Sequence, residues 1–192
     1  MFYSEYFSEF IKIFKELNFK KFDEVVDLLI NCKKRNGRLF ILGVGGSAGN
    51  ASHAVNDFRK LCQIESYTPV DNISEITAKT NDDGFDKIFD SYLKLNKLSI
   101  NDIILIFSVG GGSLERKISV NLINAIKFAK RKKTKIISII GKKGYAFKKS
   151  DISILINVKS GKFVTPISES MQTVIWHMLV THPKLQVKKT KW

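Results

Sequence analysis

A group of small residues between positions 43 and 47 is the first feature of the sequence that could bind a ligand. Gly43, Gly45 and Gly46 follow an apolar run, so the backbone can turn tightly there and approach a ligand closely. Ser47 can cap the helix predicted to follow and offer its hydroxyl to an anion, which the N-terminus of a helix also attracts. This combination is typical of a phosphate-binding turn.

Two side chains capable of acid-base or metal chemistry follow on the same predicted helix. His53 and Asp57 are four residues apart, so an imidazole and a carboxylate share one helix face, one to two turns beyond the glycines. We therefore expect chemistry next to a bound phosphate.

A second glycine-rich turn follows the apolar run at 102–107. Here Ser108 and Ser113 flank Gly110, Gly111 and Gly112. One such turn is often an ordinary connection from strand to helix, but two strengthen the prediction of an anion site, in which Ser47, Ser108 and Ser113 enclose the anion. Neither turn has the spacing of a dinucleotide fingerprint, and no Gly-Lys-Ser/Thr follows as in a Walker loop.

Length and composition bound the class of protein. A chain of 192 residues can bury one α/β core, and Cys32 and Cys62 are too few for a disulfide framework. No segment has the roughly 18 consecutive apolar residues that a membrane span needs. The net charge of +14 comes from scattered lysine clusters without interleaved aromatic residues. We therefore expect a cytoplasmic protein with a solvated basic surface, and no membrane or nucleic-acid partner.

Hydrophobic periodicity predicts alternating helices and strands. Helices are predicted at 2–17, 21–34, 47–62, 86–96, 114–130 and 167–181, and strands at 38–43, 103–108, 134–140 and 152–157, with a less certain strand near 68–70. Such a series predicts an α/β fold with a parallel sheet, whose strands end where both glycine turns lie. The first helix carries Phe7, Phe10, Ile11 and Phe14 at helical spacing, which indicates a packing or oligomer face.

The order of these motifs resembles the sugar isomerase (SIS) domain family, and within it the phosphoheptose isomerase branch. Gly43-Val-Gly-Gly-Ser47 is similar to that family's Gly-Asn-Gly-Gly-Ser, and the segment from Asn81 to Phe85 is similar to its Asn-Asp-x-Gly-Phe turn. The resemblance covers nearly the whole chain and implies a single SIS domain over 1–192 with an N-terminal helical extension over about 1–35. It implies a three-layer, doubly wound fold with five parallel strands, and a homotetramer with active sites at subunit contacts. The substrate and its phosphate would be bound by Gly45, Gly46, Ser47, Asn81, Asp82, Ser108, Gly110, Gly111, Gly112, Ser113 and Gln172.

The second turn and the first helix depart from the family pattern. The family usually has Ser-Thr-Ser-Gly-Asn-Ser where this chain has Ser108-Val-Gly-Gly-Gly-Ser113, so two hydroxyl donors are missing and backbone N–H groups must supply more of the phosphate contacts. The family's carboxylate four residues after the histidine is a glutamate, and Asp57 is one methylene shorter.

The last predicted helix can be aligned with the family in two ways. The family has a glutamine followed eight residues later by a histidine. Aligning Gln172 with the glutamine puts Val180 at the histidine position, whereas aligning His177 with the histidine puts Glu169 at the glutamine position. We prefer the second alignment, although eight residues span about 12 Å of helix, so the pair can share one centre only through long reach or irregular backbone. Gln172 would then hydrogen-bond the sugar.

Aldose-ketose isomerisation is the activity that the resemblance implies. It needs a base for a carbon-bound proton, for which the candidates are Asp57 and Glu169, and an acid partner, which would be His177. His53 would be a metal ligand or an enediolate donor, and zinc would be held by His53, Asp57, Glu169 and His177. The expected substrate is sedoheptulose 7-phosphate or a similar ketose phosphate, for heptose synthesis of bacterial lipopolysaccharide or capsule. The alternative is a non-catalytic SIS protein that binds a sugar phosphate and acts as a regulator or adaptor, as does a relative that binds the replication initiator.

Overall fold

Aliphatic and aromatic residues fill both faces of the central strands, and this pattern requires cover on two sides. The computed structural model describes residues 1–191. Every residue of β1 (Leu39–Leu42) and β3 (Ile103–Ser108) is buried. Along β1 the side chains alternate, so that Leu39 and Ile41 join one core cluster and Phe40 and Leu42 join the other.

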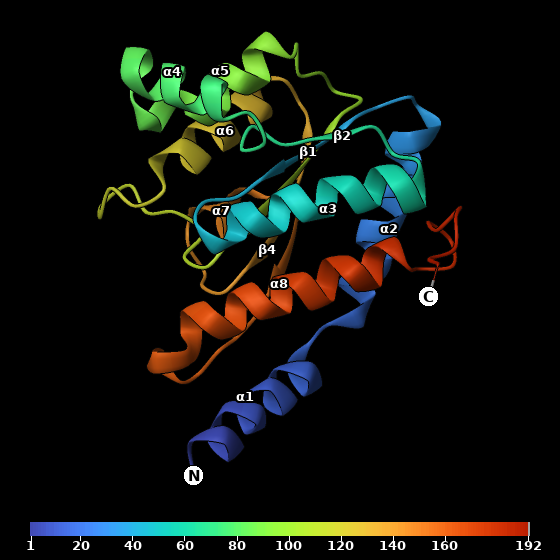
Figure 1. Ribbon diagram of the computed structural model, residues 1–192, viewed down its shortest axis with the longest axis vertical. Coiled ribbons are helices and arrows are strands. Elements are labelled where there is room, and N and C mark those ends of the chain that lie inside the picture. The colour runs from blue at the N-terminus through green and yellow to red at the C-terminus, as the bar shows by residue number, and fades with distance from the viewer. Residues whose placement is uncertain (192) are drawn as a thin grey trace.

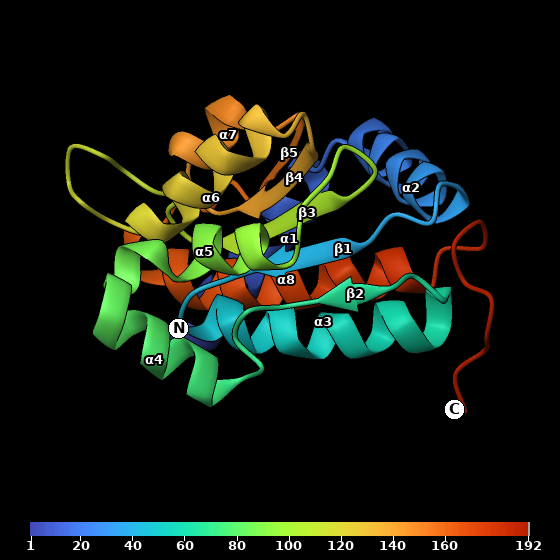
Figure 2. The same cartoon turned by 90° about the horizontal axis from the view of Figure 1, so that it is seen from above.

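Helices cover the sheet in two layers (Figure 1). One layer contains α2 (Phe19–Lys34), α3 (Gly46–Cys62) and α8 (Val164–Val180). The other contains α5 (Ile88–Leu95), α6 (Val120–Arg131) and the short α7 (Tyr145–Lys149). The N-terminal α1 (Phe2–Glu16) extends beyond one end of the first layer, and in the view from above the sheet lies between the layers (Figure 2).

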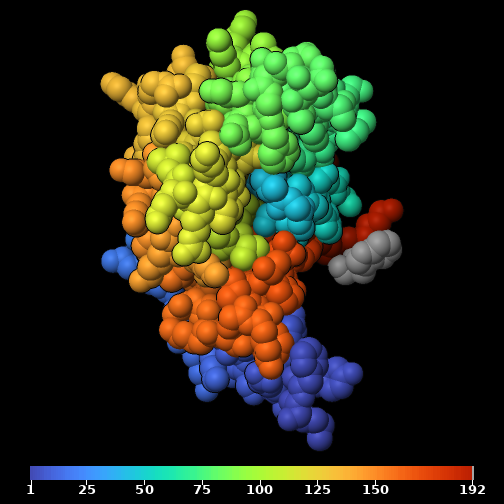
Figure 3. Space-filling view, turned by 90° about the vertical axis from the view of Figure 1, so that its left-hand side faces the viewer, coloured from blue at the N-terminus to red at the C-terminus, as the bar shows by residue number. Residues whose placement is uncertain are grey.

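The strand order places a topological switch point beside β1. The strands β2 (Ser66–Tyr67), β4 (Lys135–Ile140) and β5 (Ile152–Leu155) complete a parallel sheet in the order β2-β1-β3-β4-β5. The chain leaves β1 toward one edge and returns on its other side as β3, and ligands of such sheets bind at the carboxyl ends of the strands near this point. Figure 3 views that end of the molecule, where the segment after β1 (cyan), the loop after β3 (yellow) and the start of α8 (orange-red) lie next to one another. The predicted five-stranded, doubly wound fold is confirmed.

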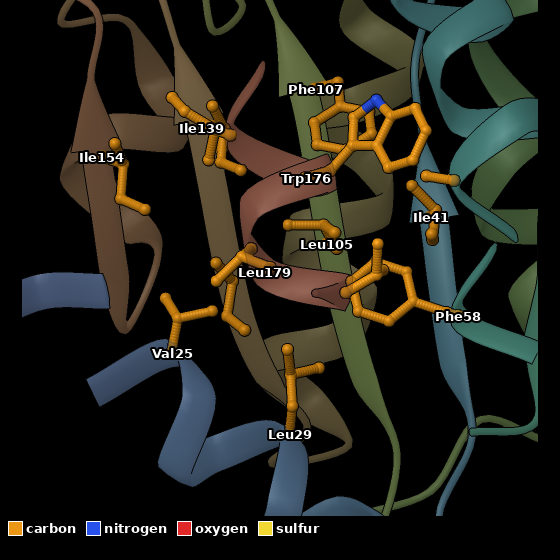
Figure 4. Close-up of a cluster of buried hydrophobic side chains, with 14 of the residues drawn as sticks. Val25, Leu29, Ile41, Phe58, Leu105, Phe107, Ile139, Ile154, Trp176 and Leu179 are labelled. Carbon is orange, nitrogen blue, oxygen red and sulfur yellow. The ribbon is translucent and has the colours of Figure 1, made fainter. Parts of the chain in front are cut away.

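The larger core cluster holds the first helical layer in place. Trp176 of α8 is fully buried and lies against the sheet near Phe107, while Phe58 of α3 fills the space beside Leu105 (Figure 4). Burying aromatic side chains of this size stabilises the fold by about 1.5–3 kcal/mol each relative to leaving them exposed. The pairing of α3 with α8 is therefore rigid enough to position side chains on both helices.

Several elements differ from the prediction. A helix α4 (Ile73–Asp83) precedes a 3₁₀ turn η1 (Phe85–Lys87), and neither α4 nor α7 was predicted. Helix α6 begins at Val120 rather than 114, the edge strand is Ser66–Tyr67 rather than 68–70, and a 3₁₀ turn η2 (Gly161–Phe163) leads into α8.

Among residues 1–191, no helix combines the length and the apolar character needed to cross a membrane.

Candidate active site

His53, Asp57 and His177 come together where α3 lies beside α8. Asp57 Oδ2 is 3.8 Å from His53 Nε2 and 3.9 Å from His177 Nε2. The Asp57 side chain is 15% exposed, against 57% for His53 and 45% for His177, so the carboxylate lies at the base of the group and the imidazoles at its opening. The predicted sharing of one helix face by His53 and Asp57 is confirmed, and α8 adds the second imidazole.

Neighbouring groups orient the side chains of His177, Asp57 and His53. His177 Nδ1 lies 2.9 Å from the Thr173 carbonyl oxygen, which can only accept, so Nδ1 carries a proton and Nε2 is the ring nitrogen that faces Asp57. Asn56 Nδ2 donates to Asp57 Oδ1 at 2.9 Å, which leaves Oδ2 facing the two histidines. The centroids of the Trp176 and His53 rings are 4.7 Å apart, and the two rings pack edge to face.

The donor atoms of this group suit a divalent metal. One ligand atom from each of the three residues lies within 4.8 Å of the other two. Two imidazole nitrogens and one carboxylate oxygen are a set that zinc accepts, and three protein ligands leave a position open for a substrate or water. The partial exposure of both histidines gives such a ligand access from solvent.

Glu169, expected as a fourth ligand and as a candidate base, lies elsewhere. It is two turns before His177 on a regular helix, so its carboxylate lies against Gly46 at the start of α3. A side chain at position 46 would contact this carboxylate, and the Glu169 side chain would have to move to admit it. The ligand atoms that lie together in this structure come from His53, Asp57 and His177, and Glu169 is not among them, so its expected place as a fourth ligand stays a prediction.

Ser47 and Gln172 belong to a buried network between α3 and α8. Ser47 Oγ donates to Gln172 Oε1 at 2.9 Å, and Asn50 Nδ2 donates to the same oxygen at 3.2 Å. Thr173 Oγ1 donates to Asn50 Oδ1 at 2.6 Å. The N-cap of α3 is Gly45, with φ 65°, so the expectation that Ser47 caps this helix is wrong. Gln172 is fully buried, which places its side chain between the helices rather than at the opening.

Sequence reasoning missed Asn50 and Thr173. Asn50 joins the two helices by accepting from Thr173 and donating to Gln172 and to the Glu169 carbonyl oxygen, and the Thr173 carbonyl sets the tautomer of His177. Their only signal in the sequence is that each precedes a site histidine by three or four residues, which places it one turn away on the same helix.

The second glycine turn is folded by its own serines. Ser108 Oγ accepts from the Gly111 N–H at 3.0 Å, and Ser113 Oγ accepts from the Arg116 N–H at 3.2 Å. Gly111 and Gly112 have φ of 72° and 82°, a conformation that favours glycine. A pocket of about 340 Å³ opens beside this turn and includes Ser113 in its lining. Gly110, Gly112 and Ser113 therefore face a space that a ligand could enter, as their sequence pattern suggested.

Asn81 and Asp82 lie at the end of α4, where both side chains are exposed. Asn81 Nδ2 donates to Asp82 Oδ1 at 2.9 Å. Gly84, with φ 85°, ends the helix directly after them. Their expected part in binding substrate stays a prediction.

The chain is similar to known proteins at three levels, namely a family model, whole sequences and solved structures. A family model described as SIS domain matches residues 2–141. The phosphoheptose isomerase of Buchnera aphidicola subsp. Schizaphis graminum is 31% identical over 191 residues, covering 93% of this chain and 92% of that protein. The phosphoheptose isomerase of Citrifermentans bemidjiense is 26% identical over 168 residues, covering 83% and 78%. Among solved structures, the phosphoheptose isomerase of Neisseria gonorrhoeae shares the fold with a TM-score of 0.79 over 93% of both chains, at 22% identity.

Proposed function

The chain belongs to the SIS-domain family, and from that premise we propose that it is a phosphosugar isomerase of the phosphoheptose type, which converts sedoheptulose 7-phosphate or a similar ketose phosphate into an aldose phosphate. The observation that carries the proposal is the convergence of Asp57 with two imidazoles at the opening between α3 and α8. An isomerase needs a base and an acid within reach of two neighbouring carbons, and this group supplies both. The product would serve heptose synthesis for surface polysaccharide.

Asp57 is the base in this proposal, because Glu169 lies away from the imidazoles. Its Oδ2 takes the proton from the hydroxyl-bearing carbon of the ketose and returns it to the neighbouring carbon that was the carbonyl. His177, held by Thr173 through Nδ1, moves a proton at Nε2 between the two oxygens, so that one becomes the carbonyl and the other the hydroxyl. His53 presents a third polar group toward the same oxygens.

A zinc ion would fit the His53, Asp57 and His177 donor set. When bound, it would supply a Lewis acid that stabilises negative charge on the substrate oxygens. The protein residues would still determine which carbon loses its proton, since the substrate is oriented by the groups around this opening.

We further propose that the chain forms one SIS domain with an N-terminal helical extension over about 1–35, and that it works as a homotetramer. The outward face of α1 supports this, because Tyr3, Phe7 and Ile11 are more than half exposed although they are large and apolar. We place the reaction in the cytoplasm, because a charged sugar phosphate does not cross a bilayer unaided.

Turnover of defined ketose phosphates tests the proposal. Purified protein is assayed with C5 to C8 ketose phosphates, after chelation and again with zinc added. Asp57→Asn and His177→Ala should each lower kcat by about 10²–10⁴-fold, because each removes a proton-transfer group. The melting temperature of both variants should stay close to that of the wild type, since both side chains are partly exposed.

His182→Ala is the matched control, because His182 is a half-buried histidine that lies just beyond α8 and outside the group formed by His53, Asp57 and His177. It should keep full activity. Full activity in Asp57→Asn would move the base to Glu169. Absence of turnover on every substrate, with sugar-phosphate binding intact, would overturn the enzyme and support a regulator or adaptor.

A further inference from the structure

The group formed by His53, Asp57 and His177 is divided between two helices. His53 and Asp57 belong to α3, and His177 belongs to α8, which lies beside α3 in Figure 1 and Figure 2. His177 Nε2 is 3.9 Å from Asp57 Oδ2 only while the two helices keep their present register. A shift of α8 by one residue would move its side chains about 1.5 Å along the helix axis. The contacts that fix the register therefore determine whether the group forms.

Apolar packing holds α3 and α8 in place but is a weak determinant of their register. Phe58 of α3 and Trp176 of α8 are fully buried in the same core cluster (Figure 4). The hydrophobic effect is non-directional, so it tolerates small displacements of one helix along the other. Hydrogen bonds weaken steeply when their angle departs from linearity, so bonds between the two helices restrict such displacements more strongly.

One pair of side chains links α3 to α8 one turn before His177. Thr173 Oγ1 donates to Asn50 Oδ1 at 2.6 Å, and Asn50 Nδ2 donates to the Glu169 carbonyl oxygen at 2.9 Å. Asn50 is therefore bonded to both ends of one turn of α8. The Thr173 carbonyl oxygen in turn accepts from His177 Nδ1, at 2.9 Å. A single residue, Thr173, thus connects Asn50 of α3 with the His177 ring.

The other hydrogen bonds between these helices do not lead to the His177 ring. Within residues 1–191, they join Ser47 and Asn50 to the fully buried Gln172 side chain, and Cys62 to the Val180 carbonyl oxygen. The bond from Cys62 Sγ is 3.5 Å long, and a thiol is a weak donor. Of the α8 residues that are hydrogen-bonded to α3, Thr173 is therefore the one that also holds the His177 imidazole.

We propose that Asn50 and Thr173 are positioning residues, which hold the His177 ring beside Asp57 and so determine the affinity of the group for zinc. The inference rests on the proposed function for the use that is made of His177, but not for the position of its ring. The effect passes from the Asn50 side chain through Thr173 and its carbonyl oxygen to His177 Nδ1. Loss of such outer partners of a histidine ligand typically weakens metal binding about 10–100-fold.

Zinc affinity of the full chain tests this role without requiring turnover, and it is measured by competition with a chromophoric chelator. Thr173→Val keeps the shape of the side chain but removes the hydroxyl, so it should raise the dissociation constant for zinc about tenfold. Thr173→Ser keeps the hydroxyl and should stay close to the wild type. Thr181→Val is the matched control, because Thr181 Oγ1 bonds only to the carbonyl oxygens of His177 and Met178 and does not reach α3.

The two residues should act as one unit. Asn50→Ala should weaken zinc binding at least as much as Thr173→Val, because it removes the bond to the Glu169 carbonyl oxygen as well. The double variant should be no weaker than Asn50→Ala alone, since residues in one hydrogen-bond network are not additive. The melting temperature is measured on the same samples. A merely structural role would lower it and leave the zinc affinity of the folded protein unchanged, and that result would overturn the proposal.

An equal loss of zinc affinity in Thr181→Val would also overturn the proposal, and so would a wild type that binds no zinc. In turnover assays, Thr173→Val should lower kcat more than it changes KM, because it displaces a proton-transfer group rather than a binding group. A protein whose zinc affinity depends on Thr173 but which turns over no ketose phosphate would contradict the isomerase function and leave the positioning role standing.

Discussion

At the scale of single residues, Asp102 is the buried carboxylate with the most hydrogen bonds. It accepts from the Arg38 guanidinium at 2.9 and 3.1 Å, from the Arg38 N–H at 2.9 Å and from the Ser99 N–H at 2.8 Å. Burial alone raises the pKa of this carboxyl, but the Arg38 side chain and then the backbone N–H groups lower it more, so the pKa lies below its usual value. The charged form is therefore stabilised by folding.

We predict that Asp102→Asn lowers the free energy of unfolding at pH 7 by about 2–4 kcal/mol, because Arg38 loses its partner. A group with a lowered folded-state pKa stabilises the protein above its unfolded pKa of about 3.9, and this contribution is lost as the pH falls through the folded-state value. Urea unfolding at pH 7 and at pH 3 should therefore show a difference from the wild type that shrinks at the lower pH. Asp86→Asn, at an exposed position, should change little at either pH.

The pairing of His53 with Asp57 could be predicted from the sequence because the two residues are neighbours on one helix face. His177 could be assigned only through the family resemblance, since its approach to Asp57 depends on how α8 lies against α3. The position of Glu169 could not be derived for the same reason. Side-chain partners across two helices follow from the crossing of those helices, which no local pattern encodes.

At the scale of elements, one buried carboxylate is among the contacts that attach α1 to the body of the molecule. Glu9 is 5% exposed, and its Oε1 accepts from the N–H groups of Lys159 and Ser160, at 2.5 and 3.1 Å. These residues belong to the connection between β5 and α8. Apolar contacts are added by Ile13, which is also buried, and by Tyr6, whose ring lies 5.0 Å from that of Phe163.

Glu9→Gln should lower the free energy of unfolding by about 1–2 kcal/mol and speed amide hydrogen exchange in α1, because charge-assisted hydrogen bonds to the connection become weaker. The control on the same helix is Glu5→Gln. Glu5 pairs with Lys162 at 2.7 Å, but both side chains are about half exposed, so the change should cost less than about 0.5 kcal/mol. Equal effects of the two substitutions would mean that α1 is attached by other contacts.

Periodicity predicted the long buried elements and missed the exposed ones. Helix α4 has no buried residue, so the alternation of apolar and polar positions that identifies a helix is weak there. Its start is instead fixed by the Asn72 side chain, which accepts from the N–H groups of Ser74 and Glu75. The late start of α6 has a local cause as well, because Ser119 adopts a left-handed conformation that no pattern of hydrophobicity reports.

At the scale of the whole molecule, the outer face of α1 exposes several large apolar side chains in a row. Tyr3, Phe7, Ile11 and Phe14 are 71%, 63%, 56% and 42% exposed, while Phe10 turns toward the core. The sequence predicted an apolar face here, and the structure divides it into an inner and an outer part. Stable self-association is the expected use of the outer part.

We predict an oligomer at micromolar concentration by light scattering, and a smaller species for Ile11→Glu, because a charge cannot be buried unpaired in an apolar contact. Ile73→Glu is the matched control, since Ile73 of α4 is 71% exposed and lies outside this face. A wild-type monomer would contradict the proposed tetramer. Dissociation by both substitutions would assign the contact to a broader surface.

The strand order also determines when the molecule can fold during synthesis. β1 is made early, but β3, which pairs with it from Leu39↔Ile103 onward, emerges only after α3, β2, α4 and α5. The helix that covers the same face of both strands, α8, is the last one in the chain, and Trp176 lies in its second half. An apolar surface therefore stays open on the ribosome until almost the whole chain has been made. Nascent copies of this protein must be kept apart during that interval, because their unpaired strands have the same sequence and could pair with one another.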